Sequence, residues 1–173
     1  QYDAAIDFAS IIRQTDRRAQ IQIKIAISQV EGNQKSAARS NFANALRIAQ
    51  ESANIFLYAR TLACIGVIQV KNQQFQQGIS TAKDVENIVK NIDNLRHQAI
   101  LLARVAEAFA LAEKIDESQS IFNKAKHIAT NINNQQESSD SFRTITLTEA
   151  SIKYFSAAFK TAQKIELPWT RLE

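Results

Sequence analysis

The sequence is poor in the residues that interrupt helices. Its 173 residues include three Gly and one Pro, and they contain no Met. Because Gly and Pro are the strongest local breaks in regular structure, their scarcity favours a nearly all-helical fold over a turn-rich β-fold. Cys64 is the single cysteine, so it has no disulfide partner within the chain and matches no metal-ligand spacing. A lone cysteine either favours a reducing compartment or carries no information about it, so the localisation stays open, with the cytoplasm favoured.

Long apolar runs and a strong charge of one sign are also missing. No run approaches the ~18 apolar residues of a membrane span, so we expect no membrane insertion. Lys and Arg number 21 against 17 Asp and Glu, a formal net charge of +4, which permits contact with anions but is too mild for a nucleic-acid-binding arm. With 45% hydrophobic residues the chain can bury a core, and we expect one soluble domain over residues 1–173.

The two ends of the sequence have the character of an excised piece. The chain starts at Gln1 without a Met, and its Leu172–Glu173 end resembles a cloning scar. We therefore expect a fragment of a longer protein, with a helical array cut at both ends. Bare apolar faces at such ends predict some self-association.

A period of 40 residues organises the chain. The bulky–small pair Ile25–Ala26 returns as Ile65–Gly66 and again as Val105–Ala106. The helix after each pair repeats as well, with apolar residues at three matched positions: Phe42, Ala45 and Ile48, then Ala82, Val85 and Ile88, then Phe122, Ala125 and Ile128. Apolar residues three and four apart mark one face of a helix, so each repeat predicts two helices packed as a hairpin.

Four hairpins are predicted, over residues 17–50, 53–90, 94–129 and 137–165. Residues 2–13 have the pattern of the second helix of an incomplete hairpin, and Leu167–Pro168–Trp169 that of a new helix start. We expect Gly32 to end its helix as a left-handed cap, and Gly78 to let two helices approach closely. The polar segment 131–141 is predicted either as a mobile loop or, because it has no Pro or Gly, as a partial continuation of the helices on each side.

The fourth hairpin departs from the period in its second helix. Its residues match the third hairpin three residues early, which pairs Ile152, Phe159, Ala162 and Ile165 with Ile115, Phe122, Ala125 and Ile128. The sequence therefore predicts a tighter turn in this hairpin. The same pattern places one aromatic ring from each second helix except that of the second hairpin in the core: Phe8, Phe42, Phe122 and Phe159.

These positions resemble the tetratricopeptide repeat (TPR). The matching residues of the first and third repeats are Ala26, Ala38, Phe42, Ala45 and Ile48, and Ala106, Ser118, Phe122, Ala125 and Ile128. The second repeat keeps only the pattern of small and branched residues: Gly66, Gly78, Ala82, Val85 and Ile88. The resemblance implies an all-α, right-handed solenoid of antiparallel hairpins, about four complete and one partial at the N-terminus. It also implies a concave groove lined by the first helix of each hairpin.

The sequence also departs from the TPR pattern. The large aromatic early in the first helix is replaced by Gln22, Leu62 and Leu102. The later aromatic survives as Phe109, while the two earlier repeats have Gln29 and Gln69 at that position. The period is also about six residues longer than the ~34 of the common repeat. We therefore describe the family as TPR-like, with longer helices or connections.

No familiar catalytic device is present in the sequence. It has no HExxH, no Cys-x-x-Cys, no Gly-rich phosphate loop and no G-x-S-x-G elbow, so we expect no enzyme, no cofactor and no metal site. His97 and His127 are expected to be solvated or capping residues. Glu107 and Glu149 are expected to be solvated or ion-paired, because general acid–base work usually needs a second group within hydrogen-bond reach.

The expected function is that of a protein-interaction scaffold that holds a peptide in its groove. Laying the TPR pattern on the sequence places these residues on the groove wall: Gln20, Ile23, Lys24, Ile27, Arg60, Ala63, Cys64, Val67, Ile100, Arg104, Glu107, Arg143 and Leu147. The wall would then be apolar with scattered cations, which suits a peptide with acidic groups. Alternatively, these cations pair with Glu31, Glu107 or Asp140 and only solvate the wall.

Two other functions stay open. A helical-repeat RNA-binding module reads one base per repeat through polar residues at matched positions, but the matched sets here are mostly apolar. Those sets are Ile23, Ala63, Ala103 and Arg143, and Ile27, Val67, Glu107 and Leu147. A sensor or regulatory segment of a larger signalling enzyme is also compatible with this sequence.

Overall fold

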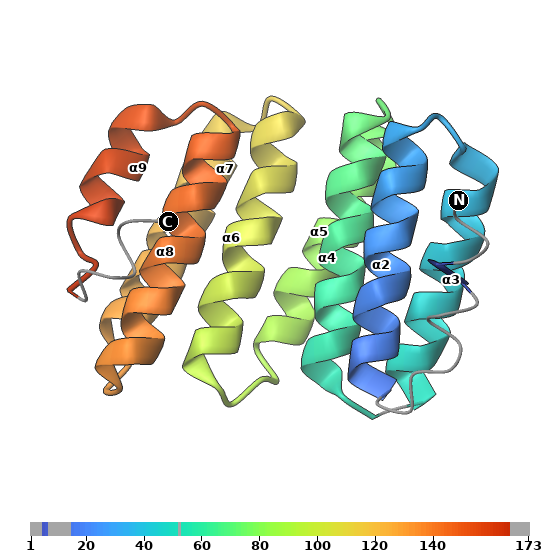
Figure 1. Ribbon diagram of the computed structural model, residues 1–173. Coiled ribbons are helices and arrows are strands. Elements are labelled where there is room, and N and C mark those ends of the chain that lie inside the picture. The colour runs from blue at the N-terminus through green and yellow to red at the C-terminus, as the bar shows by residue number, and fades with distance from the viewer. Residues whose placement is uncertain (1–4, 7–14, 52, 167–173) are drawn as a thin grey trace.

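The computed structural model describes residues 5–6, 15–51 and 53–166, and in these ranges the chain is all-helical (Figure 1). The longer helices, in order, are α2 (Thr15–Glu31), α3 (Lys35–Glu51), α4 (Ile55–Lys71), α5 (Phe75–Val89), α6 (Leu95–Leu111), α7 (Ile115–Thr130), α8 (Gln135–Ser151) and α9 (Phe155–Ala162). Consecutive helices pair as four hairpins, so the expected helical-hairpin solenoid is confirmed. Most of the helix expected at 2–13, with Phe8, and the segment 167–169 lie outside the described residues.

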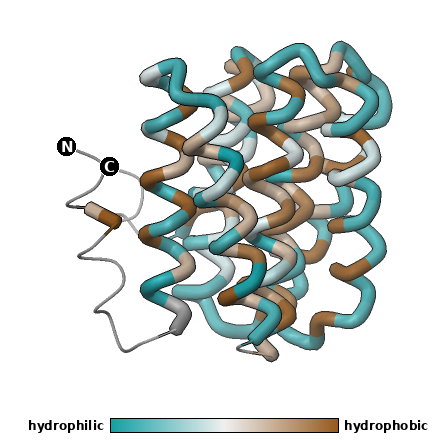
Figure 2. The backbone as a smooth tube through the Cα atoms, turned by 90° about the vertical axis from the view of Figure 1, so that its right-hand side faces the viewer, coloured by the Kyte–Doolittle hydropathy of each residue, from teal (hydrophilic) through white to brown (hydrophobic). Residues whose placement is uncertain are grey.

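The helices form two layers. In Figure 1 the first helices of the hairpins, α2, α4, α6 and α8, lie in front of the second helices, α3, α5, α7 and α9. The hairpin turns lie at the top of that view and the connections between hairpins at the bottom. Figure 2 views the stack from the side of α2 and α3, and there apolar and polar residues alternate along each helix. This alternation is what amphipathic helices need to bury one face against the next layer.

The largest core cluster extends from α4 to the end of the described chain. Its fully buried residues include Leu101, Val105, Phe122 and Ile145, which come from α6, α7 and α8. A smaller cluster around Ala26, Ala38 and Phe42 joins α2 to α3 and continues into α4. Each hairpin therefore buries its apolar face against its neighbours, as stacked repeats require.

The four hairpin turns share one backbone geometry. The residue before each second-helix cap has a left-handed φ, at Asn33 (59°), Gln73 (64°), Glu113 (62°) and Lys153 (67°). The next backbone N–H in each turn donates to a carbonyl five residues back, as Gln34 does to Gln29 at 2.7 Å. This is a Schellman-type helix end. The expectation that Gly32 takes the left-handed position is wrong, because Asn33 occupies it.

The connections between hairpins are capped by asparagine at the same repeat position. Asn54, Asn94 and Asn134 each accept, through the side-chain oxygen, a hydrogen bond from the backbone N–H three residues on, at 2.9–3.0 Å. Such caps satisfy backbone donors that the first helical turn leaves free. The mobile loop predicted at 131–141 is therefore wrong and the alternative, a partial continuation of the helix, is confirmed, because α8 begins at Gln135, directly after its cap.

Polar pairs, buried in the first and fourth hairpins and partly buried in the second, join the two helices of three hairpins at one matched position. Asn41 donates to Gln29 at 2.7 Å, and Thr81 donates to Gln69 at 2.8 Å. In the fourth hairpin Thr161 donates to Glu149 at 2.7 Å; in the third, the same two positions are Phe109 and Ile121, both buried. Gln29 and Gln69 thus replace an aromatic residue without leaving an unpaired buried amide, because the partner sits twelve residues on.

The fourth hairpin keeps the 40-residue period, and the tighter turn predicted for it is wrong. Lys153 takes the left-handed position 40 residues after Glu113. Phe159 therefore does not reach the core: it is 68% exposed, whereas Phe42 and Phe122 are 7% and 2% exposed. The turn and the buried pair beside it set the register, and the similarity between Phe159 and Phe122 in the sequence does not.

Gly78 has the packing role expected of it. A Cβ added to Gly78 would lie 2.4 Å from Val70 Cγ2 and 2.8 Å from the carbonyl oxygen of Gly66, so α4 and α5 approach each other too closely for a side chain at this point. Gly66, on the facing helix, is less crowded, and its nearest neighbour would lie at 3.3 Å.

Candidate functional site

The face formed by the first helices is hollowed by a groove of about 500 Å³. Residues of α2, α4 and α6 line most of it, and Thr144 of α8 closes one end. A cavity of this size is in the range that holds a small ligand or a few side chains of a peptide. We call this cavity the groove.

Most of the residues that the sequence placed on the groove wall come together in it. The following eight line the cavity: Gln20, Ile23, Lys24, Ile27, Arg60, Cys64, Ile100 and Arg104. They come from three helices that are far apart in the sequence. The helical spacing and the 40-residue period are what bring them to one face.

The other expected wall residues lie elsewhere. Val67 is buried in the core at 6% exposure, with Ala63 beside it in the same cluster. Glu107 is 3% exposed and lies beneath the groove, while Arg143 and Leu147 lie on α8 outside the cavity. Leu147 is half exposed. The groove therefore extends less far over α8 than we expected, and Glu107 is buried below its surface.

Two of the four cations in the groove are held by carboxylates. Arg104 Nη1 lies 2.6 Å from Glu107 Oε2, and Arg96 Nη2 lies 3.4 Å from Asp140 Oδ2. Burial disfavours the charged form of Arg104, but the Glu107 carboxylate outweighs burial and raises the pKa of this guanidinium. Arg104 therefore keeps its charge in the wall.

The other two cations in the groove are Lys24 and Arg60. Within the part of the chain that the structure describes, no carboxylate lies within 4.0 Å of Lys24 or Arg60. The groove therefore carries an uncompensated positive charge above the apolar side chains of Ile23, Ile27 and Ile100. Such a surface favours an occupant with both apolar and anionic groups.

The thiol of Cys64 lies between two of these cations and is still not activated. Its pKa is raised, because burial disfavours the thiolate more than Arg104 and Arg60 favour it, and Glu107 disfavours it further. A neutral thiol is a weak nucleophile. Cys64 is therefore a small apolar element of the groove floor.

An aromatic pair forms part of the groove near the start of α4 and α6. The rings of Phe56 and His97 stack with centroids 3.7 Å apart and planes 8° from parallel. The pKa of His97 is lowered, first by burial and then by the Arg96 charge, while Glu137 opposes this shift. The stacked imidazole is therefore neutral at pH 7. His97 is partly exposed near the start of α6, and its ring also stacks on Phe56, a contact that we did not expect.

Five residues that line the groove were not expected from the sequence: Phe56, Arg96, His97, Leu101 and Thr144. Three of them lie together near the starts of α4 and α6. Phe56 and Arg96 are 40 residues apart and lie one helical turn before Arg60 and Ile100, so the repeat itself relates them. The TPR pattern does not mark this turn. Extending the wall by one turn toward the helix starts would have found Phe56, Arg96 and the adjacent His97.

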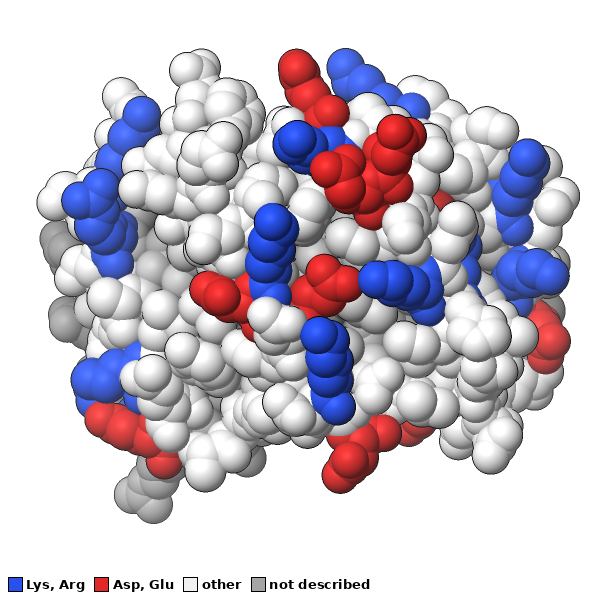
Figure 3. Space-filling model, turned by 180° about the vertical axis from the view of Figure 1, so that it is seen from behind, with Lys and Arg blue, Asp and Glu red and all other residues white. Residues whose placement is uncertain are grey.

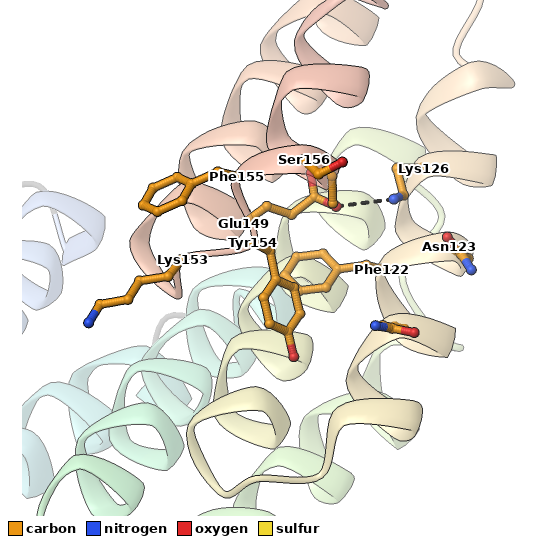
Figure 4. Close-up of a pocket in the computed structure, with 10 residues that line it drawn as sticks. Phe122, Asn123, Lys126, Glu149, Lys153, Tyr154, Phe155 and Ser156 are labelled. Atoms are coloured by element: carbon orange, nitrogen blue, oxygen red, sulfur yellow. Dashed lines mark hydrogen bonds and ion pairs between the residues drawn. The ribbon is translucent and has the colours of Figure 1, made fainter.

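A second hollow lies on the other side of the fold, between α7 and the start of α9. It has a volume of about 390 Å³, and Figure 4 shows the rings of Phe122 and Tyr154 beside the Glu149 carboxylate. Glu149 is 1% exposed and accepts from Lys126 Nζ at 3.1 Å and from Thr161. Its charge is thus satisfied within the protein, so the ion-paired state expected for Glu149 is confirmed and the solvated state is wrong.

The rear face carries no field of one sign. Figure 3 shows Lys and Arg side chains interspersed with Asp and Glu over the second helices. One of these contacts joins Lys124 of α7 to Glu86 of α5 at 3.0 Å. The uncompensated positive charge of the groove is therefore a local feature of the opposite face.

The described residues contain neither a membrane-spanning helix nor a group of metal ligands. No helix there is both long and apolar enough to cross a membrane. Within the same ranges, no three His, Cys, Asp or Glu side chains are grouped so that they could hold a metal ion.

Comparisons with known proteins bear on the fold. No family model and no curated protein matches the sequence. Among solved structures, the chain is similar to the crystal structure of Ton1535 from Thermococcus onnurineus NA1, with a TM-score of 0.60 and 15% sequence identity. The match covers 95% of this chain and 53% of that one, so this chain spans about half the length of the solved protein. At this identity the likeness shows the fold, which by itself specifies no ligand.

Proposed function

We propose that the chain is a non-catalytic protein-interaction scaffold of TPR-like type that binds an extended peptide in the groove. The observation that carries the proposal is the pair Lys24 and Arg60, two cations with no carboxylate of the described residues within 4.0 Å, set over the apolar floor. An extended segment can place an apolar side chain on that floor and a carboxylate on these cations. The partner is therefore a protein segment that alternates apolar and acidic residues.

The groove favours a peptide over single-stranded RNA. A repeat code for bases needs polar side chains exposed at matched positions of successive first helices. Here Ala63, Ala103 and Val67 are buried at such positions. The described side chains therefore offer no regular set of base-reading groups along the array.

Charge reversal of the two uncompensated cations tests the proposal. Arg104 is a poor target, because its loss would strand the buried Glu107 charge and damage the fold. Lys24→Glu with Arg60→Glu should instead weaken binding by about 2 kcal/mol, or roughly thirtyfold, with little change in the thermal midpoint. A random peptide display library on the immobilised protein supplies the ligands, and titration calorimetry of the selected peptides gives the affinities.

A matched control changes the same net charge elsewhere. Lys83→Glu with Lys160→Glu reverses two exposed cations on α5 and α9, outside the groove. This control should leave the affinity nearly unchanged. Selected peptides without Asp or Glu, or equal affinities for the groove variant and the control, would show that the groove is not the binding site.

A further inference from the structure

The Phe56–His97 stack places a titratable ring in the wall of an otherwise permanently charged groove. His97 is the third residue of α6, where its backbone N–H is capped by Asn94 at 2.9 Å. Its ring is held against Phe56 of α4, so it cannot turn away from the cavity without losing that contact. A change in its charge is therefore a change in the charge of the groove.

Burial, followed by the charge of Arg96, opposes protonation of the imidazole in the empty groove. Arg96 precedes it on α6, and Arg60 lies one turn after its stacking partner on α4. From α2, Lys24 lines the same cavity. The positive end of the α6 helix dipole acts in the same direction.

The nearby carboxylates offset this only in part. Both belong to α8: Glu137 favours the protonated ring, and Asp140 is engaged by Arg96. An anion brought into the groove would supply the missing negative charge. The protonated ring would then also make a favourable cation–π contact with the face of Phe56, on which it is stacked.

We infer that binding of an acidic segment in the groove is coupled to proton uptake by His97, so that the groove binds such a segment more tightly as the pH falls. This inference rests on the proposed function, since it concerns an acidic occupant of the same groove. His97 acts here as a specificity-determining residue: when it is protonated, the groove discriminates more strongly against neutral segments.

The direction follows from linkage. The pKa of His97 is lowered in the free protein, so the ring is neutral at pH 7. If an occupant raises that pKa, the complex binds the proton more readily than the free protein, and the affinity rises as the pH falls through this interval. For each unit by which the occupant raises the pKa, the protein with a protonated ring binds that occupant about tenfold more tightly than the protein with a neutral ring.

NMR titration of the histidine rings tests the coupling directly. The probe is a short peptide of alternating leucine and glutamate, whose carboxylates stay largely ionised down to about pH 5.5. We expect the pKa of His97 to rise when the peptide saturates the groove. His127 lies on α7, outside the groove, and serves as an internal reference that should not move.

A conservative variant supplies the matched binding experiment. His97→Phe keeps an aromatic ring on Phe56 and removes the proton. The parent should bind the peptide several-fold more tightly near pH 5.5 than near pH 7.5, and this variant should show a flat profile. Equal pH dependence in parent and variant, or a pKa of His97 that does not respond to bound peptide, overturns the inference while leaving the proposed function intact.

A carboxylate introduced into the groove by substitution tests the coupling even if the peptide fails to bind. Arg60→Glu places a negative group in the groove without any ligand and should raise the pKa of His97. No binding at any pH would remove support for the acidic-peptide function, and the coupling is then decided by this variant. An unchanged pKa of His97 in Arg60→Glu would show that charge in the groove does not reach the ring.

Discussion

Replacement of Gly78 by alanine separates helix propensity from packing at the α4–α5 contact. Propensity alone predicts that alanine stabilises a helix interior by about 1 kcal/mol relative to glycine. The structure predicts the opposite sign. A Cβ at Gly78 would lie 2.4 Å from Val70 Cγ2, 2.8 Å from the Gly66 carbonyl oxygen and 3.0 Å from the Val70 backbone N. Two of these atoms belong to the backbone, so the two helices must move apart.

The expected magnitude follows from these opposing effects. Overpacking of this kind costs about 1–3 kcal/mol, and obstruction by backbone atoms puts Gly78→Ala at the upper end. After the gain from propensity, the net loss is about 2 kcal/mol, or a fall of about 4–8 °C in the thermal midpoint of a chain of this size. Thermal unfolding followed by circular dichroism measures this shift.

Gly66 and Ala38 provide the controls. Gly66→Ala meets its nearest neighbour at 3.3 Å, so it should be nearly neutral. Ala38 occupies the place of Gly78 in the first hairpin, and Ala38→Gly should cost about 1 kcal/mol, since glycine has no advantage there. A Gly78→Ala protein that melts at a higher temperature than the parent would refute the close-approach argument.

Two further substitutions test other contacts. Asn94→Ala should cost about 1 kcal/mol of unfolding free energy through loss of the α6 cap, while Asn91→Ala in the same connection should cost much less; equal losses would show that the cap does not matter. Lys126→Ala should cost about 3 kcal/mol because it strands the buried Glu149 carboxylate, and adding Glu149→Gln should recover much of that loss. Denaturant titration of all four proteins decides both, and failure of the second change to recover stability would contradict a charge-based cause.

The 40-residue period was sufficient to predict the hairpins. Small residues recur where two helices cross, as with Ala26 and Ala38 or Gly66 and Gly78, and the apolar stripe recurs between them. Because helical geometry fixes which residues share a face, the sequence also brought Lys24, Arg60 and the other residues of α2, α4 and α6 to one wall.

Parts of the groove could not be predicted in this way. The stack of Phe56 on His97 depends on how closely α4 and α6 lie side by side at their starts. Which cations remain uncompensated depends on contacts between neighbouring helices, such as Arg96 with Asp140. The sequence contains all of these charges, but their pairing is a matter of distances that only the packed chain defines.

The fourth hairpin shows most clearly which features the sequence determines and which the packing of the helices determines. By itself, the sequence determined that a helix carries Phe159 and Ala162, because local apolar spacing is a property of the chain. Only the tertiary structure decided the register of that helix. The left-handed turn at Lys153 and the buried bond from Thr161 to Glu149 hold it at the 40-residue interval, which leaves Phe159 in solvent. In this register Thr161 satisfies the second oxygen of the buried Glu149 carboxylate, whose first oxygen is held by Lys126.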